Sequence, residues 1–396
     1  MRLGVYTDYP YHVRDGEPYG ERAFVVFIAR LAPRFARLAV FGRLDPATSP
    51  RARYRLGSEV DFVPLPYYRT LGRPRDALRS LGTAMRRFWN GIADLDCVWL
   101  LGPNPFAVVF ALLAIARRKR IVLGVRQDYP TYVRARYPKR PGIRAMAAVI
   151  DLSFRALARI YPVVVVGPEL ATTYSRSPAL LEIAVSLVEA DEIVSPDAAS
   201  ERSWEGERRV LSVGRLEEEK NPLLLARALR VLAADGARWK LTVCGEGPME
   251  EPLEAELERL GVAGQADLRG YVAQGEGLAR AYRDSHAFLH VSWTEGLPQV
   301  LLEAFAAGLP TVATDVGGIR AAVGDAVLLI PPGDPDAAAA ALNEIASDPE
   351  LRARLVDAGH EYVSARTLPR EAMRVADFIL EVAGGEPEPA AAPASG

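Results

Sequence analysis

Short apolar runs alternate with helical patterns along the first half of the chain. Apolar residues recur at helical spacing in residues 21–31, 105–118 and 143–159. Between these segments lie runs that are apolar throughout, at residues 3–7, 38–41, 61–65, 97–101, 121–125, 163–167 and 183–187. Strands of this kind, separated by helices, predict a parallel sheet that is covered by helices on both faces.

The alternation pauses once and then resumes. Residues 189–208 are acidic, serine-rich and without periodicity, which is typical of a linker. Strand-like runs follow at residues 209–213, 240–244, 266–270, 287–291, 311–314 and 326–330, with helical patterns between them. The pattern therefore predicts an α/β fold of two doubly wound, Rossmann-like parallel-sheet domains, residues 1–190 and 209–368, joined by a linker at 191–208.

In doubly wound sheets, ligands bind beyond the carboxyl ends of the strands, so two such domains predict a site in the cleft between them. The length of 396 residues agrees with two domains of ordinary size. The last segment, residues 384–396, is rich in proline and alanine and is expected to be disordered.

The net charge of −2 conceals two oppositely charged halves. Residues 1–200 contain 29 Lys and Arg against 18 Asp and Glu, a net charge of +11, and residues 201–396 contain 19 against 32, a net of −13. A basic first half favours an anionic partner. Because 44 of the 48 cations are arginine, a compositional bias that scatters arginine over solvated surfaces explains the same numbers.

Two cysteines, Cys97 and Cys244, both lie in strand-like runs and are expected to be buried and reduced. The chain turns polar soon after its first residues, unlike a signal peptide, and its longest apolar run, residues 106–116, is shorter than the ~20 residues that cross a bilayer. We therefore expect a cytoplasmic protein.

Several common site types are disfavoured. No phosphate-binding Gly-x-x-x-x-Gly-Lys is present, and Glu250 stands where a dinucleotide fingerprint starting at Gly245 needs its third glycine. The four histidines lack metal-ligand spacing. The acidic pairs at 94/96 and 334/336 lie where a strand and a helix begin, so we interpret them as structural, and we expect no metal and no cofactor.

One carboxylate is expected inside an apolar helix. Pro298 suits the first turn of this helix and Gly308 its end, and Glu303 is the only charged residue between Glu295 and Asp315. A buried carboxylate needs hydrogen-bond donors, which a ribose diol would supply. An internal arginine would satisfy it equally well. Glu295 precedes the helix, where backbone amides attract phosphate oxygens.

A second group of polar residues follows a buried strand. Gly214 ends this strand, and Arg215 and Lys220 flank the loop to the helix that starts at Pro222. Two cations at the carboxyl edge of a sheet can neutralise a diphosphate. The alternative is that they pair with the acidic residues at 217–219.

These residues resemble a known family. Glu295 and Glu303, the sequence after them as far as residue 318, the Gly-Arg-Leu…Lys of residues 214–220 and the Gly-Glu-Gly-Pro turn around Glu246 are similar to the "group 1", family 4 retaining glycosyltransferases of the GT-B fold. The resemblance is specific over about residues 209–331 and only architectural over the first 190.

The resemblance implies a nucleotide-sugar donor, held mainly by the second domain without a divalent metal. Arg215 and Lys220 would neutralise the diphosphate, Glu303 would hold the ribose and Glu295 would contact the transferred sugar. The other implied donor-binding residues are Gly214, Glu246, Arg269, Tyr271, Gly296, Leu297 and Pro298. A helix at residues 369–383 would cross back to the first domain.

The chain departs from the family in the first domain. Arg126 stands where the family has a histidine near the sugar, and Arg126 and Asp128 become candidates for catalysis or substrate binding, unless they form a structural salt bridge. The glycine pair of the first loop is loosened to Gly16 and Gly20, which we consider as acceptor-side candidates.

Three functions therefore stay open: a retaining glycosyltransferase, a nucleotide-sugar epimerase on the same fold, and a catalytically silent nucleotide-binding partner of a glycosyltransferase. Basic clusters at residues 117–120 and 134–144 suit an anionic or lipid-linked acceptor and peripheral contact with the inner face of an anionic membrane. Aromatic residues are too sparse among them to favour nucleic acid.

Overall fold

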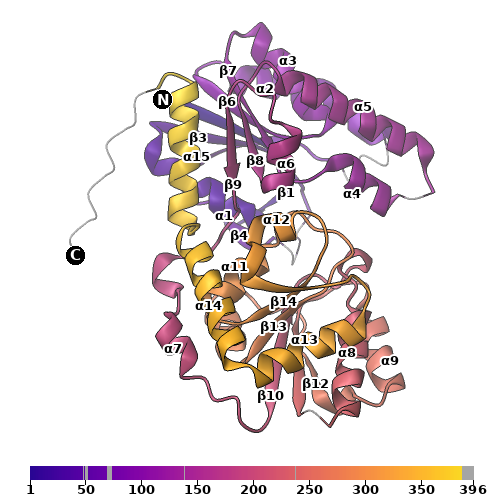
Figure 1. Ribbon diagram of the computed structural model, residues 1–396. Helices are drawn as coiled ribbons and strands as arrows, with labels where there is room; N and C mark the ends of the chain where they lie inside the picture. The colour runs from indigo at the N-terminus through magenta and orange to yellow at the C-terminus, as the bar shows by residue number, and fades with distance from the viewer. Residues whose placement is uncertain (48, 50–51, 69–73, 138, 237, 386–396) are drawn as a thin grey trace. The chain divides into compact units, whose positions relative to one another are not determined.

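The computed structural model describes residues 1–47, 49, 52–68, 74–137, 139–236 and 238–385. The chain divides into two compact units, each with its own sheet (Figure 1). The first unit comprises Met1–Leu187 and the segment from Leu368 onward, and the second comprises Val188–Thr367. Most of the predicted tail, residues 386–396, lies outside the described residues.

The first unit contains nine strands and its own helices. Its strands are β1 (Arg2–Arg14), β2 (Glu17–Gly20), β3 (Arg37–Leu44), β4 (Tyr54–Arg55), β5 (Asp61–Pro66), β6 (Cys97–Gly102), β7 (Arg120–Val125), β8 (Val163–Val166) and β9 (Leu180–Ile183). Its helices are α1 (Phe24–Ala29), α2 (Pro74–Gly91), α3 (Pro105–Ala116), α4 (Tyr129–Arg136), α5 (Pro141–Ala158), α6 (Pro168–Thr173) and α15 (Leu368–Val382).

The parallel part of this sheet runs β5-β3-β1-β6-β7-β8-β9. Chain order reverses between β1 and β6, as in a doubly wound fold. Beneath the sheet, aromatic rings from three elements fill the core: Phe88 of α2 stacks on Phe110 of α3 at a centroid distance of 4.1 Å, and Tyr6 of β1 meets Phe110 edge-on at 4.7 Å. Predicted strands match observed ones except at 183–187, where β9 lies three residues earlier.

The segment expected to be a glycine loop is a β-hairpin instead. Strands β1 and β2 pair antiparallel up to Arg14 and Glu17, leaving Asp15 and Gly16 as a two-residue turn. Both turn residues have positive φ, 53° and 82°, as a type I′ hairpin requires. Gly20 ends β2, and a Cβ at this position would lie 2.5 Å from Val25 Cγ2. These contacts give Gly16 and Gly20 structural roles in the hairpin.

The second unit has a six-stranded, wholly parallel sheet in the order β12-β11-β10-β13-β14-β15. Its strands are β10 (Arg208–Val213), β11 (Trp239–Cys244), β12 (Ala266–Leu268), β13 (Ala287–His290), β14 (Thr311–Thr314) and β15 (Val327–Ile330). Its helices are α7 (Pro196–Ser200), α8 (Leu223–Ala234), α9 (Glu250–Arg259), α10 (Glu276–Arg283), α11 (Gln299–Ala306), α12 (Ile319–Val323), α13 (Pro335–Ser347) and α14 (Pro349–Ser364). Chain order reverses between β10 and β13, and apolar residues of α8 and α13 pack with β10 and β11 in one core.

The predicted linker is a packed part of the second unit. It contains α7, which contacts α14. Val194 N–H donates to the Ala306 carbonyl, and Arg202 donates to the carbonyls of Ala307 and Gly308 at 3.3 and 3.0 Å. The last carbonyls of a helix have no partner within that helix, so this segment completes the C-terminus of α11.

Helix α15, yellow in Figure 1, lies in the first unit and contacts α1 and β9. Its buried Glu371 accepts a hydrogen bond from Ala184 N–H at 2.9 Å and one from Arg374 at 2.5 Å. Arg374 also donates to the Glu182 carbonyl at 3.0 Å. This polar contact satisfies backbone groups at the edge strand β9 that would otherwise lack partners.

Both cysteines are buried free thiols, as predicted. In the described part of the chain, no helix combines the length and the apolar character that crossing a bilayer demands.

Candidate functional site

The loops at the carboxyl ends of the second unit's strands are joined by backbone hydrogen bonds. Gly214 N–H, after β10, donates to the Cys244 carbonyl, and Gly245 N–H, after β11, donates to the Gly270 carbonyl. Trp293 N–H, after β13, donates to the Glu219 carbonyl at 2.9 Å. Because these bonds satisfy the loop backbone internally, the loops form one connected surface beside the β10/β13 reversal point, where doubly wound sheets bind ligands.

Two glycines permit this close approach. A Cβ at Gly245 would lie 1.8 Å from the Gly214 carbonyl oxygen, and one at Gly317, where φ is +54°, would lie 1.9 Å from the Glu295 carbonyl oxygen. Any side chain at either position would force the neighbouring loop away. The glycines after β11 and β14 therefore hold Gly214 and Glu295 in place.

Glu295 lies at the centre of this surface. Its Oε1 accepts hydrogen bonds from His290 Nε2 at 3.0 Å, from Ser292 Oγ at 2.8 Å and from Lys220 Nζ. No described residue donates to the other oxygen, Oε2. The carboxylate is therefore oriented by three donors on one oxygen, which leaves the second oxygen for a ligand.

The charge of Glu295 is compensated within the site. Its side chain is only 9% exposed, and burial alone would raise the pKa of its carboxyl. The hydrogen bond from His290 and the positive charge of Lys220 outweigh burial and hold the pKa of Glu295 well below its usual range. Glu295 is thus a fixed negative charge at neutral pH.

The second predicted cation, Arg215, has a different environment. Its side chain is 47% exposed and donates to Glu217, with Glu219 at 3.9 Å. The acidic pairing considered from the sequence is therefore present for Arg215, whereas Lys220 pairs with Glu295. Exposed ion pairs are weak, so Arg215 can exchange its partner for an anionic ligand.

Glu303 is buried on α11, and its partner is a tyrosine. Its Oε2 accepts a hydrogen bond from the Tyr282 hydroxyl on α10 at 2.8 Å, and no described arginine bonds to it. Burial raises the pKa of Glu303, partly offset by the Tyr282 hydrogen bond and reinforced by the nearby charge of Glu192. The internal-arginine alternative is therefore not observed.

The remaining predicted donor residues lie at the same edge of the sheet. Glu246 accepts the Leu216 N–H through its carbonyl. Arg269 follows β12 and bonds Asp267 at 2.7 Å, and Tyr271 is 37% exposed two residues later. Gly296, Leu297 and Pro298 lead into α11, with Pro298 at the N-cap.

The first unit separates Arg126 from Asp128. Arg126 follows β7, donates to the Tyr9 hydroxyl and lies 4.0 Å above the Phe24 ring. Burial lowers the pKa of Arg126 to about 10, and its Nε has no hydrogen-bond partner. Asp128 is instead the N-cap of α4, where it accepts from Thr131 N–H at 2.9 Å. No salt bridge joins these two described residues.

The sequence analysis missed a polar cluster at the β1/β6 reversal point. Asp8, at the carboxyl end of the regular part of β1, accepts from Tyr68 and lies 3.2 Å from Arg43 Nε. Burial raises the pKa of Asp8, and Arg43 opposes that rise. The Tyr6 hydroxyl bonds Asn104 after β6 at 3.3 Å. This cluster could have been found in the sequence from the polar residues that follow apolar strands, such as Asp8 and Asn104.

His290, Ser292 and Tyr282 in the second unit were missed as well. His290 ends the apolar strand β13, and this position was a usable signal, because a buried imidazole there needs a partner. Tyr282 carried a weaker sequence signal than His290, because a buried tyrosine at the end of an amphipathic helix is ordinarily part of the hydrophobic core.

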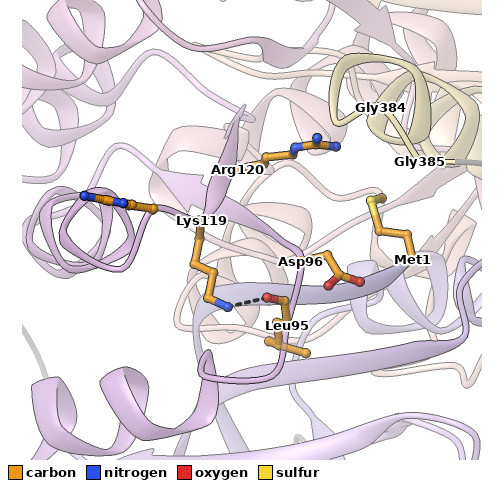
Figure 2. Close-up of a pocket in the computed structure, with 8 residues that line it drawn as sticks. Met1, Leu95, Asp96, Lys119, Arg120, Gly384 and Gly385 are labelled. Atoms are coloured by element: carbon orange, nitrogen blue, oxygen red, sulfur yellow. Dashed lines mark hydrogen bonds between the residues drawn. The ribbon is translucent and has the colours of Figure 1, made fainter.

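A pocket of about 460 Å³ lies elsewhere, at the amino ends of β1, β6 and β7 (Figure 2). Figure 2 shows Lys119 pointing to the Leu95 carbonyl, which it reaches at 2.6 Å, and Asp96 of this pocket pairs with Arg2. Lys119 and Asp96 thus have internal partners, and the pocket lies at the edge of the sheet opposite to the one where such folds bind ligands.

Part of the chain is similar to known glycosyltransferases. Residues 196–362 match the family model described as "Glycosyl transferases group 1". A D-inositol 3-phosphate glycosyltransferase of Kribbella flavida is 37% identical over 210 residues, 49% of each chain, and the sulfoquinovosyl transferase of Arabidopsis thaliana is 28% identical over 65% of this chain and 51% of its own. The chain thus spans about half the length of these relatives.

Solved structures share the whole fold. Sucrose-phosphate synthase from Thermosynechococcus elongatus has a TM-score of 0.69 at 17% identity and covers 96% of this chain and 99% of its own. HepE of Anabaena in complex with UDP has a TM-score of 0.69 at 16% identity, with 96% and 100% coverage. The chain has the predicted GT-B fold, and residues 196–362, within its second unit, are similar to the group 1 glycosyltransferases.

The Lys220–Glu295 pair should contribute to stability. Lys220→Met leaves a buried carboxylate with one donor fewer, so we expect the free energy of unfolding to fall by about 2 kcal/mol in urea denaturation. Arg215→Met removes only an exposed pair and should cost less than about 0.5 kcal/mol. Equal losses in the two variants would contradict the assigned geometry.

Glu303 should reduce the stability of the ligand-free protein. Its raised pKa means that the fold favours the protonated carboxyl, so stability is lost as the pH rises through that pKa. Glu303→Gln mimics the protonated form and keeps an acceptor for Tyr282. We expect its Tm to exceed that of the wild type by about 2 °C at neutral pH, and the gain to vanish at acidic pH. Exposed Glu254→Gln is the control, and a gain that persists in acid would refute the assignment.

Proposed function

We propose that the protein transfers a sugar from a nucleotide diphosphate sugar to an acceptor, with retention at the anomeric carbon. The observation that carries this is the Glu295 carboxylate at the β10/β13 reversal point, oriented through Oε1 by Lys220, His290 and Ser292, with no donor to Oε2 among the described residues. The group 1 family match and the shared fold of UDP-bound HepE support a donor of this class.

The donor is proposed to bind across the loops of the second unit. Glu295 Oε2 accepts a hydroxyl of the transferred sugar, and Glu303, ionised by the incoming ligand, accepts the ribose hydroxyls. Arg215 exchanges Glu217 for a phosphate oxygen, and Lys220 supplies a second positive charge. Backbone groups at residues 214 and 296–298 contact the diphosphate and sugar, and residues 246, 269 and 271 adjoin the base.

In the proposed reaction, the anomeric C–O bond breaks and its electron pair goes to the diphosphate oxygen. The acceptor hydroxyl attacks from the same face, and its proton passes to the departing phosphate. Positive charge already positioned at the leaving group stabilises the transition state. We propose that Arg215 and Lys220 supply that charge without a divalent metal or other cofactor.

Arg126 is proposed to bind an anionic group on the acceptor. Even with its pKa lowered to about 10, its guanidinium keeps its proton at neutral pH, so it cannot serve as an acid or base. This weakens the epimerase alternative, which needs proton exchange at the sugar. The acceptor itself, and a cytoplasmic location on the inner face of a membrane, remain predictions.

A panel of nucleotide sugars, incubated with the protein and EDTA, distinguishes the three functions. We expect slow donor hydrolysis that falls about 10²–10³-fold in Arg215→Met.

A thermal-shift assay ranks UDP, GDP, ADP and dTDP as ligands. At about 100 times its Kd, the correct nucleotide should raise the free energy of unfolding by about 2.7 kcal/mol. The increase should be smaller in Glu303→Gln.

Other outcomes of this experiment reject the proposal. A new sugar isomer would indicate an epimerase, and nucleotide binding without turnover would favour the silent partner. If no nucleotide shifts the melting temperature, the donor assignment is wrong.

The Arg126 assignment is tested with inorganic phosphate in the presence of saturating UDP, which fills the donor site. Phosphate at about ten times its Kd should stabilise the wild type by about 1.4 kcal/mol, and Arg126→Gln should lose this gain while keeping the UDP shift. Asp128→Asn, at the cap of α4, is the control. An equal phosphate response in Arg126→Gln would remove Arg126 from anion recognition.

A further inference from the structure

The outward face of α5 is apolar. Exposed residues recur along it at Ala145, Ala148, Val149, Leu152 and Ala156, which places them on one side of the helix. Val149 is 63% and Leu152 69% exposed. The opposite side, including Ile150 and Phe154, is buried against the first unit. A helix that is apolar on both sides is normally covered on both sides.

Helix α3 extends this face. It contacts α5 and lies next to it in Figure 1, and its sequence, PFAVVFALLAIA, contains no polar side chain. Leu112 and Ile115 of α3 are exposed, as is Met146 of α5. We call the exposed side chains of Leu112, Ile115, Met146, Val149 and Leu152 the α3–α5 surface. Single exposed apolar residues are ordinary, but a group on two adjoining helices marks a binding surface.

The exposed charges on α3, on α5 and directly flanking them are positive, and the exposed carboxylate of Asp128 lies at the start of the neighbouring α4. Exposed cations follow α3 at Arg118 and Arg120, precede α5 at Lys139 and Arg140, lie in its first turn at Arg144 and follow its end at Arg159. The one acidic residue in either helix, Asp151, is buried and bonded to Arg155 at 2.6 Å. An apolar centre with a cationic border matches the anionic headgroups and acyl chains of a bilayer surface.

We propose that the α3–α5 surface docks peripherally on an anionic lipid bilayer. The aliphatic side chains enter the boundary between headgroups and acyl chains, and the arginines bind lipid phosphates. A second copy of the chain is disfavoured as the partner, because it would bring two cationic borders together. Nucleic acid is disfavoured as well, because aliphatic side chains offer its bases no stacking surface. The proposal rests on the first unit alone and needs no glycosyl transfer.

Flotation of the full-length protein tests this with vesicles of phosphatidylcholine alone or mixed with phosphatidylglycerol. We expect the wild type to float only with the anionic vesicles, and high salt to weaken binding. The double variant V149E/L152E should bind at least about tenfold more weakly, because it places carboxylates at the apolar centre. Met373→Glu, at an exposed apolar position of α15, is the matched control and should bind like the wild type.

A second variant, R140A/R144A, tests the charge while leaving the apolar residues in place, and it should also lose binding to anionic vesicles. The melting temperature and the UDP shift of each variant report folding and the donor site separately from membrane binding. Absence of wild-type flotation, or binding unchanged in both double variants, overturns the proposal. So does a wild-type dimer that V149E/L152E converts to a monomer, because the surface would then be an interface between copies.

Discussion

The burial of one carboxylate, Glu295, constrains the second unit's site. Its charge must be compensated inside the protein, so Lys220 from the loop after β10, His290 at the end of β13 and Ser292 just after it converge on a single oxygen. The hydrogen bond from Trp293 N–H to the Glu219 carbonyl joins these two loops. Because Gly245 and Gly317 have no side chain, the loops after β11 and β14 can approach Gly214 and Glu295 closely. The residues in these loops, the packing of the loops and the compensation of charge therefore all depend on the Glu295 carboxylate.

The two buried glutamates differ in a way that suits the proposed transfer. Glu295 has its charge compensated by the protein, whereas Glu303 accepts, from the part of the chain that the structure describes, only the hydrogen bond of the Tyr282 hydroxyl, a neutral donor. A buried acid with too few hydrogen-bond donors lowers the stability of the ligand-free protein. The same acid increases the affinity for a ligand that donates a hydrogen bond to it. At position 303, the carboxylate therefore lowers stability but favours the proposed donor binding. At position 295, the interactions that stabilise the fold also orient the carboxylate for the proposed donor.

The sequence predicted the strands of the second unit and the positions of polar residues after them, because apolar strands and polar residues at their ends follow local rules. Gly214 and Lys220 follow β10 and Glu295 follows β13, as their positions after strands imply, and Glu303 lies on α11. Partner choice was not predictable: Arg215 and Lys220 have the same charge and the same loop, but only Lys220 reaches Glu295. In the first unit, Asp15-Gly16 was a readable hairpin signal that the search for a glycine loop overlooked. Asp128 acts as a helix cap, which its spacing to Thr131 could have suggested.

The packed segment ahead of β10 bears on how such proteins are recombined. Arg202 and the Val194 amide complete the C-terminus of α11, the helix that carries Glu303. Sequence periodicity resumes at residue 208. A chimera that exchanges second units between relatives at this residue would combine α11 of one protein with the segment before β10 of the other. A crossover before Val188 transfers the helix together with the segment that finishes it. Donor preference should therefore move between scaffolds as a block that begins some twenty residues earlier than the strand pattern suggests.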